Sequence, residues 1–223
     1  MPIKRCLASL VAVSLLPAGA IICAPPASAA DLRFTASPKE VVVNQSYENV
    51  TWSVKGGDVY LVDGVDANLE HTATREAADF DFTFDGDTAG SFRVYDWERM
   101  GRYTVYGSAH DYDYNELSVA STQLIIKRAS RSKLTASRSG RLVTLKAVTK
   151  RYDGGYPLWE GHRKATVTYQ RYARGKWRNL DSLRVRSNGV TQLTVRKAKK
   201  SKYRVLVKES ARVWSSKSRA VRR

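Results

Sequence analysis

Three histidines supply the only imidazoles of the chain, and no catalytic motif accompanies them. His71, His110 and His162 stand far apart, and no Gly-x-Ser-x-Gly, Ser-x-x-Lys or His-Glu-x-x-His pattern occurs. A triad assembled from distant loops stays open on sequence grounds. We predict no catalytic residue, no metal site and no cofactor.

Asp96 and Glu98 are the carboxylates best spaced for acid–base chemistry. Residues two apart on a strand share a face, and a glycosidase needs carboxyl groups about 5 to 10 Å apart. We favour the simpler interpretation, in which both are solvated acids on an exposed face. A glycan hydrolase that uses this pair is kept as a third functional hypothesis.

Two acidic stretches have some features of calcium loops. Residues 85–96 place acids at the first, third and twelfth positions and glycine at the sixth, but Ala89 takes the fifth, which must supply oxygen. We interpret this stretch as a turn between strands. Residues 111–116 form the second cluster. Weak calcium binding stays open at Asp85, Asp87 and Asp96, or at Asp111 and Asp113.

Cations gather in two stretches of the second half, residues 171–178 and 196–204. A hairpin with Ala173 to Gly175 as its loop sets Tyr172 opposite Lys176 on one solvent-directed face, together with Gln170 and Arg178. Tyr169 and Trp177 then point into the core. The residues predicted to bind a ligand are Arg171, Tyr172, Arg174, Lys176, Arg178, Lys197, Lys199, Lys200 and Lys202.

The two halves of the chain carry opposite charge. Residues 31–128 hold 17 acidic and 9 basic side chains, a net charge of −8, whereas residues 129–223 hold 4 acidic and 27 basic ones, a net charge of +23. A domain this basic attracts polyanions whatever their sequence. The alternative is that Lys and Arg only keep the domain soluble.

The first 30 residues have the features of a secretory signal peptide. Lys4 and Arg5 precede an apolar run, and the stretch ends in Ala27-Ser28-Ala29-Ala30. Cleavage there removes Cys6 and Cys23, so the mature chain has no cysteine and no disulfide. Lipidation at Cys23 is an open but disfavoured alternative. We expect a secreted protein, extracellular or wall-associated, without a membrane span.

Short runs rich in Val, Tyr, Phe and Thr alternate with Gly-containing breakers such as Asp63-Gly64. Strands are predicted at 32–36, 50–54, 59–62, 79–84, 91–95, 103–106 and 120–126, then at 133–137, 142–149, 165–171, 176–180, 183–186, 191–196, 203–208 and 219–221. Residues 127–132 are predicted to be a linker. The pattern predicts an all-β chain of two tandem immunoglobulin-like antiparallel sandwiches, residues 31–128 and 129–223.

Gly101 to Val105 has the form of a tyrosine corner, in which Tyr103 is buried and its hydroxyl bonds to the backbone just upstream. Tyr203 stands in the matching place of the second half. Without a disulfide, the aromatic core around Trp52 and Phe82 must stabilise the first sandwich, so we expect Trp52 to point inward.

The second half resembles the Ig-like β-sandwich repeats of secreted actinobacterial proteins. The residues that carry the resemblance are Gly140 to Leu145, Val167 to Arg171, Gly175 to Trp177, Gly189, Tyr203 to Val205, Ser218 and Val221. The first half is similar in outline only, through Gly90 to Val94 and Gly101 to Val105. The resemblance implies a spacer or binding module and says little about activity.

The leading hypothesis is a non-enzymatic, cell-surface-associated module whose basic domain contacts an anionic polymer: wall polymer, acidic glycan or extracellular DNA. The alternative is association through charge, in which the acidic half meets the basic half of the same chain or of another protein. Because charges are screened beyond about 8 Å at physiological salt, such surfaces must touch.

Overall fold

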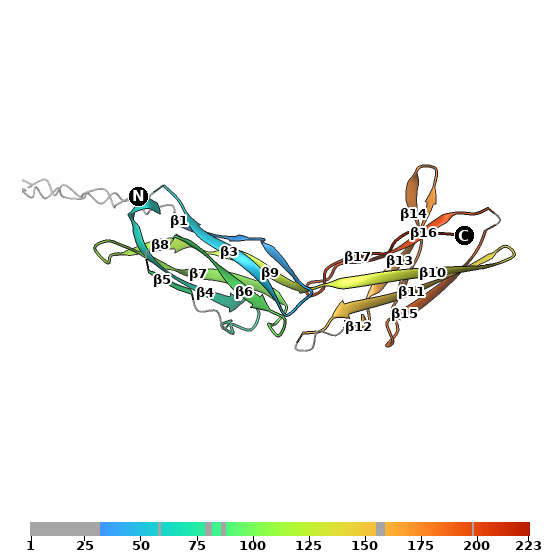
Figure 1. Cartoon of the computed structure of the whole chain (residues 1–223), viewed down its shortest axis with the longest axis horizontal. Helices are drawn as coiled ribbons and strands as arrows, with labels where there is room; N and C mark the ends of the chain where they lie inside the picture. The colour runs from blue at the N-terminus through green and yellow to red at the C-terminus, as the bar shows by residue number, and fades with distance from the viewer. Residues whose placement is uncertain (1–31, 58, 79–81, 86–87, 155–158, 198) are drawn as a thin grey trace, which may run out of the picture.

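The chain folds into two all-β halves that lie end to end (Figure 1). The computed structural model describes residues 32–57, 59–78, 82–85, 88–154, 159–197 and 199–223, so the predicted signal peptide lies outside the described residues. Each half has its own hydrophobic core. The predicted all-β fold with two immunoglobulin-like sandwiches is confirmed.

The described part of the N-terminal half forms nine strands and one 3-10 turn, η1 (Val59–Leu61). The strands are β1 (Leu32–Ser37), β2 (Glu40–Val43), β3 (Tyr47–Lys55), β4 (Val62–His71), β5 (Phe82–Asp85), β6 (Ala89–Tyr95), β7 (Gly101–Asp111), β8 (Glu116–Ala120) and β9 (Thr122–Arg128). β1, β3 and β6 pair antiparallel. β2 crosses over to run parallel to β9, which continues through β7 to β4.

The strand predicted at residues 59–62 is wrong. Val59–Leu61 form a 3-10 turn, a common connector, and the strand begins at Val62. Asp63-Gly64 has the composition of a turn. The pairing of β4 with β7 shifts between Val62 and Gly64, however, so these residues form a bulge inside a ten-residue strand.

Tyr103 and Trp52 are buried as predicted. Tyr103 is 1% exposed, and its hydroxyl donates to the carbonyl oxygen of Arg99 at 2.7 Å, which is the expected tyrosine corner. Burial raises the pKa of Tyr103, with a further increase from the carboxylate of Glu98, so the phenol stays neutral. Trp52 is 3% exposed. The side chain of Phe82 lies outside what the structure describes.

The C-terminal half packs a sheet that contains β10, β11, β12 and β15 against a sheet that contains β13, β14, β16, β17 and β18. These strands are β10 (Ser130–Ser139), β11 (Leu142–Tyr152), β12 (Trp159–Gly161), β13 (Thr166–Ala173), β14 (Lys176–Arg184), β15 (Val190–Arg196), β16 (Lys202–Val207), β17 (Ser216–Lys217) and β18 (Val221–Arg222). Val167, Tyr169, Tyr203 and Val205 fill the space between the sheets.

β14 joins the two strands predicted at residues 176–180 and 183–186. The polar pair Asp181-Ser182 does not end the strand, because a bulge in the pairing with β13, at Tyr169/Gln170, absorbs the irregularity.

The predicted linker is instead a nearly continuous strand. β9 ends at Arg128 and β10 begins at Ser130, and Ala129 between them packs into the N-terminal core. The N–H of Ala129 donates to Val43 at 2.8 Å, and its carbonyl accepts from the N–H of Tyr152 at 2.9 Å. The backbone is therefore hydrogen-bonded across the boundary to both halves.

Buried polar side chains fasten this junction. Lys127, whose side chain is 6% exposed, pairs with Glu209 and, at 3.5 Å, with Glu40. Arg128 pairs with Asp153 at 2.9 Å.

A buried phenol also crosses the junction. The hydroxyl of Tyr152 donates to Asp96 Oδ2 at 3.1 Å, and its ring belongs to the N-terminal core. The two sandwiches therefore meet through specific contacts between side chains as well as through the chain itself.

Candidate anion-binding site

The turn between β15 and β16 presents lysines at the end of the molecule away from the junction, which we call the distal end. Lys199, Lys200 and Lys202 are exposed, whereas Lys197 is half-buried. Arg138 of β10 holds this turn, because its guanidinium donates to the carbonyls of Lys197 at 2.9 Å and Lys199 at 3.2 Å. The backbone is thus anchored while the lysine ammonium groups remain free to meet a ligand.

A cavity of about 360 Å³ lies at the distal end, and its described lining consists of cations alone: Arg138, Lys200, Arg222 and Arg223. Arg223 is fixed by a hydrogen bond from Nε to the carbonyl of Ala136 at 2.8 Å. No described Asp or Glu side chain lines the cavity, so basic side chains set its charge. Guanidinium groups in a fixed fork suit sulfate, phosphate and carboxylate.

An aromatic and cationic row lies next to this cavity on the outer face of the second sheet. The guanidinium of Arg204 stacks on the Trp177 ring at 4.2 Å, and Tyr172 meets Trp177 edge to face at 5.4 Å. Gln170 accepts from Arg204 Nε at 2.7 Å, which fixes the guanidinium plane. Lys202 pairs with Arg222, so this face is continuous with the cavity.

The hairpin register predicted from the sequence is wrong. Its loop has two residues, Arg174 and Gly175, at φ of 52° and 76°, so Tyr172 opposes Trp177. Trp177 therefore lies on the outer face beside Tyr172 and is not a core residue. Tyr169 is fully buried, as predicted.

The corrected register divides the predicted hairpin residues between two faces. Tyr172 joins the face that leads to Lys202, and Arg174 occupies the exposed tip that projects from the sandwich in Figure 1. Arg171 and Arg178 pair with each other on the opposite side. Arg171 is half-buried and opposes Tyr203, so it points toward the end of the core.

The predicted ligand-binding residues did not include four cations of this surface: Arg138, Arg204, Arg222 and Arg223. Arg204 ends the cationic stretch 196–204, but Arg138 lies in β10 and Arg222 and Arg223 at the end of the described chain, so no local cluster marks the four as a set. Alternation in β16 was the available signal for Arg204, because Tyr203 and Val205 point inward and the residue between them must point outward.

Asp96, one of the two carboxylates considered for catalysis, has a structural role. Asp96 is 5% exposed and accepts the hydrogen bond from Tyr152, so it is neither a solvated acid nor open to a substrate. Asp111 organises its own loop by accepting from the backbone N–H groups of Asp113 and Asn115. The side-chain amide of Asn115 also donates to both carboxylate oxygens of Asp111, and this lowers the pKa of Asp111 most, followed by the backbone bond from Asn115.

Within the described ranges, no three acidic or histidine side chains converge on a metal site. Of the predicted calcium ligands, Asp87 lies outside the described residues, and Asp96 is engaged at the junction. β5 ends at Asp85 and β6 begins at Ala89, and residues 86 and 87 of the predicted turn lie outside the described residues.

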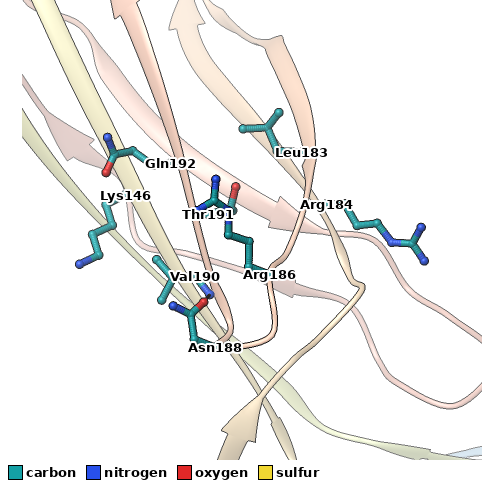
Figure 2. Close-up of a pocket in the computed structure, with 8 residues that line it drawn as sticks. All are labelled: Lys146, Leu183, Arg184, Arg186, Asn188, Val190, Thr191 and Gln192. Atoms are coloured by element: carbon teal, nitrogen blue, oxygen red, sulfur yellow. Dashed lines mark hydrogen bonds between the residues drawn. The ribbon is translucent and has the colours of Figure 1, made fainter.

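A larger hollow of about 670 Å³ lies between the edge strands β14 and β15. Figure 2 shows that Arg184 points away from Lys146 and Gln192, so these groups do not converge on one point. It is a less suitable anion site than the distal cavity.

No protein-family model matches the chain, and no curated protein matches it. Similar solved structures include a tetra-tandem repeat from the extending region of a large adhesion protein, 17% identical with a TM-score of 0.37, covering 86% of this chain and 48% of that one. This chain thus spans about half of that fragment.

Two further solved structures are similar. The human OSCAR ligand-binding domain is 15% identical with a TM-score of 0.32, covering 85% of this chain and 96% of that one. The Clostridium thermocellum CbhA fibronectin(III)-like modules are 14% identical with a TM-score of 0.35, covering 83% and 92%. At these identities the likeness concerns fold alone. Among the described residues, no helix is long and apolar enough to cross a membrane.

Proposed function

We propose that the protein is a secreted, non-enzymatic binding module whose distal end contacts an anionic polymer, such as wall polymer, acidic glycan or extracellular DNA. The observation that carries this proposal is the distal cavity lined by Arg138, Lys200, Arg222 and Arg223. The affinity of a polymer with repeated anionic groups increases with each cation that it contacts, because counterions are released.

The distribution of acids supports the distal end as the binding surface. Residues 129–223 contain four acids, and three of them, Asp153, Glu160 and Glu209, pair with Arg128, Arg151 and Lys127 at or next to the junction. Asp181 is the fourth, and it accepts from the N–H of Ser182. The distal cations therefore keep their charge for a ligand.

The proposal assigns a role to each part of the chain. Residues 1–30 direct export, residues 31–128 form the acidic sandwich, and residues 129–223 form the basic one. In the basic sandwich, Tyr172 and Trp177 offer aromatic faces to sugar rings or bases. Lys199, Lys200, Lys202, Arg204 and Arg222 supply charge along the same surface.

Retention of the whole mature chain on heparin resin tests this proposal. We expect elution well above 0.15 M salt, and a clearly earlier elution for the Lys200→Gln/Arg222→Gln double variant. A matched control, Lys133→Gln/Lys146→Gln, removes the same charge from the outer face of the other sheet and should elute close to the wild type. Elution of the wild type at or below about 0.15 M, or equal losses in both variants, would overturn it.

A second candidate function is association between chains through opposite charge. The net charges of −8 and +23 motivate it, and the end-to-end arrangement keeps the distal end of one chain away from its own N-terminal half (Figure 1). Light scattering at low and high salt tests it, with salt-sensitive dimers expected. A monomer at both salt concentrations would exclude this function and leave polymer binding in place.

A further inference from the structure

We propose that a second cavity, beside the junction, binds one tetrahedral oxyanion group, such as a sulfate or a phosphate, against His162. This cavity of about 450 Å³ lies between the segment that leads into β13 and the segment that follows β16. It is separate from the distal cavity and independent of polymer binding there.

Cations dominate the lining of this cavity. Arg163, Lys164, Lys208 and Arg212 contribute four charges, and no ion pair within the described part of the chain engages them. The one acid in the lining, Glu209, pairs with Lys127. The cavity therefore has an excess of positive charge, which favours an anion.

His162 is a buried titratable side chain in the lining of this cavity. The residue is 6% exposed, and its Nδ1 has no hydrogen-bond partner among the described residues. A buried polar atom without a partner costs free energy, and native structures satisfy most of them. Because Nδ1 itself is buried, a bound oxyanion would act on His162 through charge: the residue lines the cavity, and a nearby anion stabilises its imidazolium.

The backbone of Lys164 is held in a conformation that lysine rarely adopts. Its φ is 62°, and its N–H donates to the carbonyl of Val185 at 3.3 Å. Left-handed backbone at a residue other than Gly, Asn or Asp is uncommon and strained, and Arg75, Tyr114 and Arg174 adopt it as well. Glycine would fit the backbone better, so a lysine here is consistent with a use for its ammonium group.

Anion binding should be coupled to proton uptake by His162. Burial lowers the pKa of His162, and the Arg151 guanidinium lowers it further, while Glu160 acts in the opposite direction. The free imidazole is therefore neutral at pH 7. A bound divalent anion stabilises the imidazolium and raises this pKa, so affinity should increase as the pH falls.

Histidine NMR on the whole mature chain tests the site, with inorganic sulfate as the probe because it stays divalent from pH 5 to 8. We expect saturating sulfate to raise the pKa of His162 by about half to one unit relative to chloride at equal ionic strength. His71 and His110 serve as internal controls and should shift far less. No shift of His162, or an equal shift in chloride, would overturn the proposal.

Variants locate the effect in the cavity. Lys208→Gln combined with Arg212→Gln should weaken sulfate binding about tenfold, whereas the distal pair Lys200→Gln/Arg222→Gln should leave the His162 titration unchanged. This contrast separates failure of the cavity from failure of polymer binding. Equal effects of the two pairs would overturn the assignment.

Lys164→Gly provides a variant that cannot be confused with unfolding. It should keep or raise the melting temperature while weakening sulfate binding, because it removes a cation and relieves the backbone. A sulfated monosaccharide should bind at least as tightly as the free ion, since the cavity is larger than sulfate requires. If the sulfated monosaccharide does not bind, the ligand is not a sulfate group attached to a sugar. If Lys164→Gly binds sulfate as tightly as the wild type, Lys164 does not contribute to the site.

Discussion

The junction and the distal end hold their cations in opposite ways. At the junction, Lys127 is buried between Glu209 and Glu40 and lies 4.9 Å from the ring of Trp214. At the distal end, Lys200 and Arg222 line a cavity in which no described acid is present. The same residue types thus serve cohesion at one end and remain available to a ligand at the other.

This difference shows why net charge alone is a poor guide to function. A balance of +23 over residues 129–223 does not show that three of the four acids of this half pair with cations at or next to the junction, two of which, Lys127 and Arg128, belong to the N-terminal half. Cations that lie beside an acid have a structural role. The cations left without acids identify the candidate site, and this separation requires coordinates because the partners are distant in sequence.

The largest effect is expected from Lys127→Ala. This change leaves Glu209 and Glu40 without their cation and removes the contact with Trp214, so it should destabilise the protein by about 2 to 3 kcal/mol. The loss stays at the lower end for a buried pair because both acids retain contact with water. Urea denaturation measures it.

Lys200→Ala is the matched distal control for this prediction and should change stability by less than about 0.5 kcal/mol. Equal losses in the two variants would show that the ends do not differ in how they use cations.

The next effect is expected from Tyr152→Phe. Its hydroxyl is the donor to buried Asp96, and hydrogen bonds to charged groups contribute about 1.5 to 3 kcal/mol. We expect a loss near 1.5 kcal/mol, recovered in part by Asp96→Asn in the double variant. Additive losses from the two changes would contradict a direct coupling between them.

Tyr103→Phe should have a smaller effect of about 1 kcal/mol. The hydrogen bond to the carbonyl of Arg99 is between neutral groups, and phenylalanine keeps the ring in place. The loss should appear in the unfolding of the N-terminal half, followed by tryptophan fluorescence from Trp52. An unchanged midpoint would remove the corner as a source of stability.

Sequence alone predicted the strand-rich fold and the buried positions, because alternation of apolar residues reports which face of a strand is inside. Tyr169 was placed correctly on this basis, Tyr103 from the tyrosine-corner pattern, and Trp52 from the need for an aromatic core in a sandwich without a disulfide. Pairs that contain glycine were a less reliable guide to the positions of turns. Asp63-Gly64 has the composition of a turn, yet cross-strand pairing makes it a bulge, and the local sequence does not record the partner strand.

The candidate site was predicted only in part. The turn at residues 196–204 was identified from its density of cations. The hairpin loop, however, is one residue shorter than predicted. This changes the strand register, so Trp177 and Lys176 lie on the faces opposite to those predicted. Arg138 and Arg223 line the same cavity although they lie near opposite ends of the sequence of the C-terminal half. Their proximity follows from tertiary pairing and has no signature within either segment.

The smallest effect is expected from Tyr203→Phe, and its sign is the sharpest test of the comparison between the two ends. Tyr203 is fully buried like Tyr152, but its hydroxyl has no partner among the described residues. Burying a hydroxyl that makes no hydrogen bond costs free energy, and Tyr203→Phe removes this cost. The free energy of unfolding should therefore stay within about 0.5 kcal/mol of the wild type or increase. Urea denaturation of Tyr203→Phe beside Tyr152→Phe measures both under one condition. A loss from Tyr203→Phe as large as that from Tyr152→Phe would mean that the distal phenol has an acceptor, and the distal end would then be as fully satisfied as the junction.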